Sequence, residues 1–263
     1  MRLSRMLLAA AMAAVSTAAL AASPFAGTWK TDLKSAAFNP RPDVMVLTGG
    51  NFNCKSCIPP VTVPADGNWH AVKGHDYYDE IMVNIDGPRA VTVSRRKGGK
   101  PTSVSTETAS ADGQTLMIAY HDHSSPNGEV VDSTVTQVRI GRLPIGAHVT
   151  SGSWRTTKVA TASDAALTWT FADRPGGLGF ADQTGTSFEA RFGGPAVPLK
   201  GDNGGTMVSI KQVSPRVMVE TDTRAGKVVS VSTSTVSLDG KTLTIDNEDR
   251  RAGGKSRFTA TRQ

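Results

Sequence analysis

The sequence predicts an all-β protein made of two similar antiparallel units in tandem. Three observations carry this prediction: an internal repeat, hydrophobic alternation with a period of two, and Asp-Gly, Asn-Gly and Gly-Gly turns between the alternating runs. Gly99–Ile118 and Gly226–Ile245 are offset by 127 residues (226 − 99 = 127) and share thirteen of twenty positions without a gap. Self-similarity of this extent indicates duplication of one folding unit.

Residues 1–21 have the pattern of a cleaved signal peptide. Arg2 and Arg5 precede the apolar run Leu7–Leu20, and an Ala-x-Ala cleavage motif ends at Ala21. The run is shorter than the roughly 20 apolar residues that a membrane-spanning helix requires, and no later stretch approaches that length. We therefore expect a periplasmic or secreted protein with no transmembrane segment.

The charge of the mature chain is only mildly basic. Loss of the signal peptide leaves 27 Lys and Arg (29 − 2) against 23 Asp and Glu, a net charge of +4. The basic residues are scattered, apart from short runs at residues 95–97 and 250–251. Because a nucleic-acid interface needs a basic face with interleaved aromatic side chains, we expect no nucleic-acid partner.

The repeat divides the chain into two copies of similar length. Copy one is expected at residues 24–142 and copy two at residues 151–263, joined by a linker at residues 143–150 that contains a proline and a glycine. A unit of this size can bury a single hydrophobic core. Each copy opens with a Gly-x-Trp motif, in Phe25-Ala26-Gly27-Thr28-Trp29 and in Gly152-Ser153-Trp154.

Strands are expected wherever apolar and polar residues alternate, because one face of such a strand is buried. About eight short strands per copy fit the spacing of an antiparallel barrel or sandwich, and the abundance of Val, Thr and Ile favours strands. The clearest alternating positions are Ile81, Val83 and Ile85, then Leu116, Ile118 and Tyr120, and in copy two Leu243 and Ile245.

The Gly-x-Trp opening followed by an antiparallel meander resembles lipocalin-like (calycin) β-barrels. In such barrels the first-strand tryptophan closes one end, and an arginine of the last strand lies over it. The resemblance implies that Arg139 or Arg142 lies over Trp29 and that Arg262 lies over Trp154, with a cation–π contact in each pair.

The mature chain also resembles exported bacterial proteins with tandem lipocalin-like domains. The shared features are Cys-x-x-Cys-x-Pro-Pro at residues 54–60, Gly-Lys-Val-Val-Ser-Val-Ser at residues 226–232 and Asp-Gly-Lys-Thr at residues 239–242. The resemblance implies two tandem antiparallel lipocalin-like β-barrels and assigns no activity. Because the copies are shorter than lipocalin domains, narrower lumens are expected, either open or filled.

Cys54 and Cys57 admit three interpretations: a structural disulfide, half of a metal site, or a redox pair. A thioredoxin-type pair lies at a helix N-terminus, and the prolines at residues 59 and 60 are incompatible with such a helix. Copy two aligns Ala190 and Gly193 at these positions, so the fold does not require the pair. In an exported protein a structural disulfide is the expected state.

Four histidines in copy one are metal-ligand candidates. His121 and His123 lie at i and i+2, on one face of a predicted strand end, and His70 and His75 precede them. The competing interpretation is a polar hairpin tip, since Ser, Pro, Asn and Gly follow directly. We expect no metal site, and we keep these histidines as candidates.

The sequence contains no Gly-x-Ser-x-Gly elbow, His-Glu-x-x-His motif or phosphate-binding loop. We therefore expect a binding protein without a cofactor, which holds a small apolar or amphipathic molecule in a barrel lumen. Two alternatives stay open: a structural or stress-related envelope protein with filled barrels, and a metal or enzymatic site in copy one. The size of the inward-facing side chains decides between open and filled lumens.

Overall fold

The structure is a computed structural model that describes residues 22–263, so the expected signal peptide at residues 1–21 lies outside the described residues. The described chain folds into twenty strands and one short helix, α1 (Asp164–Leu167). Within this range, no helix has the length and apolar character that crossing a membrane requires. The strands form two antiparallel sheets of ten strands each, and each sheet curls into a nearly closed barrel.

One barrel, which we call the continuous barrel, is formed by an unbroken stretch of chain. Its strand order is β4-β3-β2-β11-β10-β9-β8-β7-β6-β5. Buried valines of β4 and isoleucine and valine of β6 pack in one core across the gap between the sheet edges. The strands are β2 (Asp43–Thr48), β3 (Asn51–Cys54), β4 (Val61–Pro64), β5 (Trp69–Ala71), β6 (Glu80–Ile85), β7 (Ala90–Lys97), β8 (Lys100–Ala109), β9 (Thr115–Asp122), β10 (Val131–Ile140) and β11 (Gly152–Ala162).

The other barrel, which we call the split barrel, combines the first strand of the chain with the last nine. Its order is β14-β13-β12-β1-β20-β19-β18-β17-β16-β15, and a bridge between Phe192 and Ile210 joins its two edges. The strands are β1 (Gly27–Ala37), β12 (Thr168–Arg174), β13 (Gly177–Asp182), β14 (Ser187–Arg191), β15 (Val197–Pro198), β16 (Met207–Ser214), β17 (Val217–Arg224), β18 (Lys227–Val236), β19 (Thr242–Asp249) and β20 (Lys255–Arg262).

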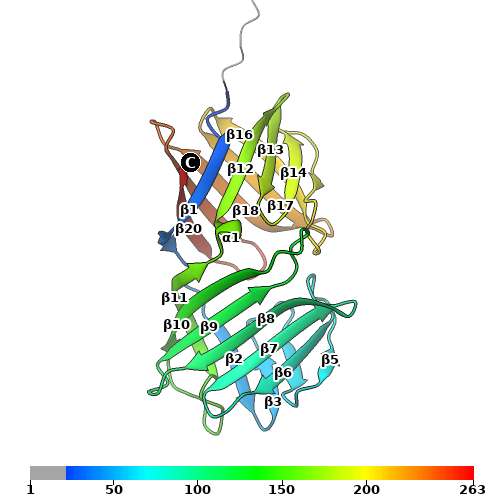
Figure 1. Ribbon diagram of the computed structural model, residues 1–263, viewed down its shortest axis with the longest axis vertical. Helices are drawn as coiled ribbons and strands as arrows, with labels where there is room; N and C mark the ends of the chain where they lie inside the picture. The colour runs from blue at the N-terminus through cyan, green and yellow to red at the C-terminus, as the bar shows by residue number, and fades with distance from the viewer. Residues whose placement is uncertain (1–21) are drawn as a thin grey trace, which may run out of the picture.

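The expectation of an all-β protein with two tandem antiparallel barrels is confirmed, but the division of strands differs from the sequence repeat. Copy one, residues 24–142, places its tryptophan strand β1 in the other barrel, between β12 and β20 (Figure 1). Copy two, residues 151–263, places its tryptophan strand β11 beside β10 and β2. The two copies have therefore exchanged first strands, and the continuous barrel is inserted between β1 and β12.

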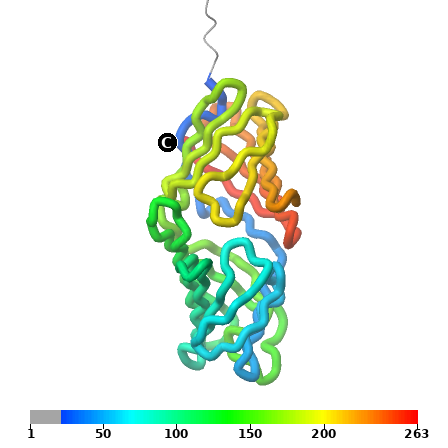
Figure 2. The backbone as a smooth tube through the Cα atoms, turned by 90° about the vertical axis from the view of Figure 1, so that its right-hand side faces the viewer, coloured from blue at the N-terminus to red at the C-terminus, as the bar shows by residue number. Residues whose placement is uncertain are grey.

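The segments between the barrels also differ from the expected linker. Residues 143–150 lie within the connection from β10 to β11, which are neighbours in one sheet. The chain passes between the barrels at residues 38–42 and at residues 163–167, which include α1. The barrels stack along the long axis of the molecule, and β1 lies in the same barrel as the C-terminal strands (Figures 1 and 2).

One end of each barrel is closed by a buried tryptophan and an arginine. The Arg262 guanidinium carbon lies 4.3 Å from the centroid of Trp29, and that of Arg139 lies 4.1 Å from the centroid of Trp154. Both tryptophans are fully buried. A cation–π pair is therefore present at each closed end, but the partners implied by the resemblance are wrong: Arg262, not Arg139 or Arg142, lies over Trp29, and Arg139, not Arg262, lies over Trp154, because the first strands are exchanged. Arg142 is exposed and takes no part.

Each closing arginine also binds backbone carbonyls at the barrel end. Arg139 donates to the carbonyl oxygens of Gly113, Ser151 and Val149 at 2.6, 2.5 and 2.6 Å. Gly152 allows this approach, because a Cβ there would lie 2.5 Å from Arg139 Nη1 and its φ is +135°. The Gly-x-Trp motif thus supplies both the ring and the space for the guanidinium.

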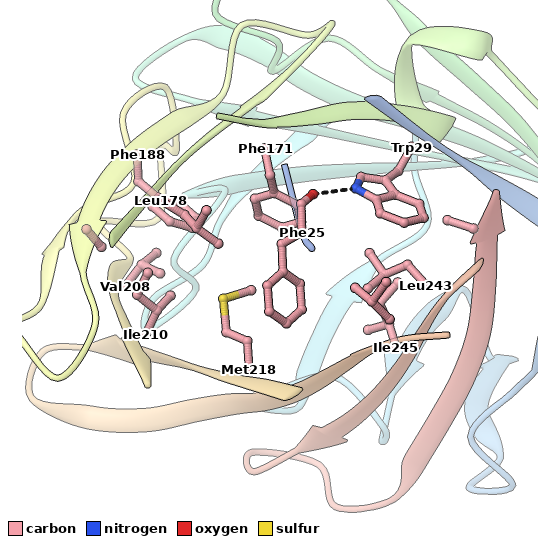
Figure 3. Close-up of a cluster of buried hydrophobic side chains, with 13 residues drawn as sticks. Phe25, Trp29, Phe171, Leu178, Phe188, Val208, Ile210, Met218, Leu243 and Ile245 are labelled. Carbon is pink, nitrogen blue, oxygen red and sulfur yellow. Dashed lines mark hydrogen bonds between the residues drawn. The ribbon is translucent and has the colours of Figure 1, made fainter. Parts of the chain in front are cut away.

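The core of the split barrel lies against its closed end (Figure 3). Trp29 Nε1 donates a hydrogen bond of 2.8 Å to the carbonyl of Phe25, which fixes the indole across the barrel. Phe25 and Met218 lie among aliphatic side chains from both sides of the sheet, and all are buried. This packing leaves the opposite end of the barrel, its mouth, as the place where a lumen can open.

Candidate functional site

The two barrels face each other with their mouths. Arg224, at the end of β17 in the split barrel, donates from Nη1 to Asp76 Oδ2 at 3.1 Å. Arg251, in the hairpin between β19 and β20, donates to the same oxygen at 2.7 Å and to the carbonyl of Ile58 at 3.0 Å. One carboxylate of the continuous barrel thus receives charge-assisted hydrogen bonds from two guanidinium groups of the split barrel, and these contacts link the two mouths.

A cavity of about 240 Å³ opens at the mouth of the split barrel. It lies directly on the core, since it shares buried residues with that cluster. Strands β12, β13, β19 and β20 supply an apolar wall, whose members are Trp169, Phe171, Phe180, Leu243, Ile245 and Phe258. Phe258 stands edge-on to Trp169, with ring centroids 6.5 Å apart.

The remaining wall of this cavity is polar and comes chiefly from β17 and β18. Glu220 faces Ser232 across the strand pair, and Ser234 is the next inward residue on β18. Asp182 lies at the rim, where its Oδ1 accepts hydrogen bonds from the turn that follows β13. The cavity therefore has one aromatic and aliphatic side and one side that can bind a polar group.

Glu220 titrates far from the usual range of a carboxyl group. Burial within the lumen, reinforced by the nearby charge of Asp222, raises the pKa of Glu220 to about 8. Burial also raises the pKa of Asp222, although the hydroxyl of Ser230 donates to its Oδ2 at 2.8 Å. Asp222 Oδ1 is buried and accepts no hydrogen bond from residues 22–263.

The lumen of the continuous barrel carries a different polar set. Burial raises the pKa of Glu107 to about 7, and the positive charge of Arg95 acts in the opposite direction. Gln137, which is 2% exposed, donates from Nε2 to Asp43 at 2.6 Å and to Thr156 at 3.2 Å. This barrel thus contains a cation beside its buried acid.

A second hollow, of about 370 Å³, lies between the barrels. Its walls include Cys57, His75, Tyr78 and Arg95 from the continuous barrel and Arg251 from the split barrel. His75 stacks on Tyr78 with centroids 4.4 Å apart. Burial, together with the two arginine charges, lowers the pKa of His75 and disfavours an imidazolium there.

The expected disulfide is present, and it joins Cys54 to Cys57. The alignment that placed Ala190 and Gly193 opposite these cysteines is wrong in three dimensions. In the continuous barrel, Gly152 of the tryptophan strand pairs with Met45, which pairs with Cys54. In the split barrel, Gly27 pairs with Phe171, which pairs with Phe180. Cys54 therefore occupies the position of Phe180. The disulfide thus lies where the split barrel has an aromatic side chain in its lumen.

The candidate metal ligands of copy one do not converge. His70 Nε2 lies 2.8 Å from Asp66, and His121 Nδ1 lies 2.6 Å from Asp132. His123 is exposed, and only His75 shares a hollow with a cysteine. Among residues 22–263, no three His, Cys, Asp or Glu side chains are grouped closely enough to hold a metal ion. Copy one thus lacks the donor geometry for the metal alternative.

Sequence reasoning did not single out Glu220, Trp169 or Phe258. One signal pointed to Glu220: it occupies an inward position in the alternation that runs from buried Met218 to Asp222 on β17. Trp169 and Phe258 gave no such signal, since they belong to strands whose neighbours depend on the exchange of β1.

Comparison with known proteins adds no identity to this geometry. No protein-family model and no curated protein matches the chain. The function must therefore be argued from the site itself.

Proposed function

We propose that the protein is an exported binding protein that holds a small amphipathic molecule in the lumen of the split barrel. The observation that carries the proposal is the cavity of about 240 Å³ with an aromatic wall and a facing carboxyl group. Ligand sites combine an apolar surface with a few polar groups that fix orientation. The cavity is smaller than the roughly 300–1,000 Å³ typical of sites for drug-sized molecules, so a small ligand is proposed.

The position of the cavity supports entry of a ligand from the space between the barrels. The closed end of the split barrel is filled by Trp29, Phe25 and Met218, so the cavity opens at the mouth. Ala166 of α1 lies at the rim, close to where the chain passes between barrels. Export is the part of the proposal that rests on residues 1–21, and a mature N-terminus at Ala22 would support it.

Native mass spectrometry of protein from its own host tests the proposal. The expected result is a bound small molecule, released on denaturation and identified from its mass. Ser234→Leu fills the cavity from β18, whereas Thr235→Leu places the same side chain on the exposed outer face of that strand. Loss of the bound mass in the first variant only is expected. An unliganded mass for the wild type, or equal retention in both variants, would contradict binding in this lumen.

A further inference from the structure

The lumen of the split barrel has neighbouring acidic groups, and no basic group acts on Glu220, whereas the charge of Arg224 acts on Asp222 nearer the mouth. Glu220 and Asp182 are the titratable side chains that line the cavity, and no Lys, Arg or His of the described residues does so. Asp222 follows on the inward face of β17, nearer the mouth. A buried carboxyl group is stable in its ionised form when a cation or several hydrogen-bond donors lie beside it.

The continuous barrel shows what the split barrel lacks. With the offset of 127 residues from the repeat, Asp222 corresponds to Arg95 (222 − 127 = 95) and Ser234 to Glu107 (234 − 127 = 107). In the continuous barrel, Arg95 therefore supplies a positive charge to Glu107 from within the same lumen. In the split barrel the corresponding position is acidic, and Glu220 adds a second carboxyl group.

The nearest basic residue on β17 is engaged elsewhere. Arg224 donates to Asp76 across the gap between the barrels and from Nε to Thr206 at 2.8 Å. Its guanidinium carbon also lies 4.7 Å from the ring centroid of Tyr77, which belongs to the continuous barrel. These contacts hold Arg224 at the interface rather than beside Glu220.

The apolar wall has the composition that recognises an organic cation. Trp169 and Phe258 meet edge to face, and Phe180 makes contact with Phe171 at a centroid separation of 5.7 Å. Aromatic faces attract ammonium groups, and the attraction grows when water is excluded. Glu220 lines the same cavity as this wall, so its carboxyl group can contact a ligand held there.

We propose that the split barrel selects a small organic cation, an amine or quaternary ammonium compound, with its charge against Glu220 and its carbon atoms against Trp169 and Phe258. This inference rests on the proposed function and names the chemical class of its ligand. No covalent step is involved, since the site offers only charge and shape.

Binding of a cation is coupled to a proton on Glu220. The pKa of about 8 means that the carboxyl group is mostly protonated at neutral pH, and a cation must displace that proton. Asp222 from β17 and Asp182 from β13 face the same space, whereas β18, β19 and β20 contribute serines, aliphatic residues and a phenylalanine. Affinity is therefore expected to increase from pH 6 to pH 9, by up to about a hundredfold if binding needs full ionisation.

Three probes of similar shape and different charge test the proposal on the full mature chain. Choline is a permanent cation, tert-butylethanol is its neutral analogue, and ionised tert-butylacetic acid is its anionic analogue. Calorimetry at pH 9, with tryptophan fluorescence as a second signal, gives the three affinities. We expect choline to bind at least about tenfold more tightly than the alcohol. Glu220→Gln is expected to abolish that ratio, whereas Glu129→Gln, the same change at an exposed site, is expected to preserve it.

The outcomes separate this inference from the proposed function. Equal affinities for choline and the alcohol, or a preference that survives in Glu220→Gln, would overturn the cation proposal and leave binding in the lumen intact. Absence of binding by all three probes would also overturn it. Native mass spectrometry of the wild-type protein from its own host then tests separately whether the lumen holds any small molecule. Selectivity in the wild type decides the question even if a variant fails to fold.

Discussion

Replacement of Glu220 by glutamine should change how the stability of the protein depends on pH. In the folded state Glu220 keeps its proton up to a pKa of about 8, against an ordinary value of 4.5. Between these two values the folded protein holds a proton that the unfolded chain releases. The favourable contribution is therefore fully present below pH 4.5 and is lost as the pH rises to about 8. Glutamine has no proton to lose, so the variant should lack this decrease.

The size of the effect follows from the shift in pKa. The difference of about 3.5 units (8 − 4.5) corresponds to about 5 kcal/mol at about 1.36 kcal/mol per unit. That value is an upper limit, because the cavity opens at the mouth and water can hydrate the ionised group. We expect wild-type stability to decrease by roughly 2–4 kcal/mol more than that of Glu220→Gln between pH 5 and pH 9.

Urea unfolding at pH 5, 7 and 9 measures this difference, with tryptophan fluorescence as the signal. Glu129→Gln removes one exposed carboxylate and serves as the control for net charge. The refuting result is a Glu220→Gln variant whose stability falls with pH as steeply as that of the wild type. Such parallel curves would mean that Glu220 is hydrated in the folded state and that the lumen does not desolvate it.

Three further predictions concern the fold. The isolated fragment 43–162 holds all ten strands of the continuous barrel and should unfold cooperatively. Fragment 24–142 lacks β11 and should be less stable or aggregate. Equal stability of the two fragments in circular dichroism melts would argue against the strand exchange. Gly152→Ala should cost about 2–4 kcal/mol, because the added Cβ collides with Arg139, and an unchanged urea midpoint would show that the guanidinium moves freely. Replacing both cysteines by alanine should cost at most about 2 kcal/mol, since the disulfide closes a very short loop; a much larger decrease in melting temperature would contradict this estimate.

Much of the architecture followed from local patterns in the sequence. Alternation such as that of buried Ile81 and Val83 with Met82 between them determines a strand, because successive side chains of a strand point to opposite faces. Asp-Gly pairs such as Asp112-Gly113 supply the positive φ of the hairpins. The disulfide between Cys54 and Cys57 was expected from their spacing together with the signal-peptide pattern at residues 1–21, and it is present. These features depend on neighbours a few residues away, and the sequence specifies them directly.

The partner of each tryptophan strand was decided only by the tertiary structure. Because the chain is a duplication, β1 and β11 carry the same Gly-x-Trp motif, and either strand meets the requirements of either arginine. The cavity also depends on which tryptophan strand completes the split barrel. Trp169 pairs with Trp29 of β1, and Glu220, on the opposite wall of the same cavity, comes from β17. A local pattern fixes which face of a strand is buried. Which of two equivalent strands completes a barrel depends on the whole path of the chain.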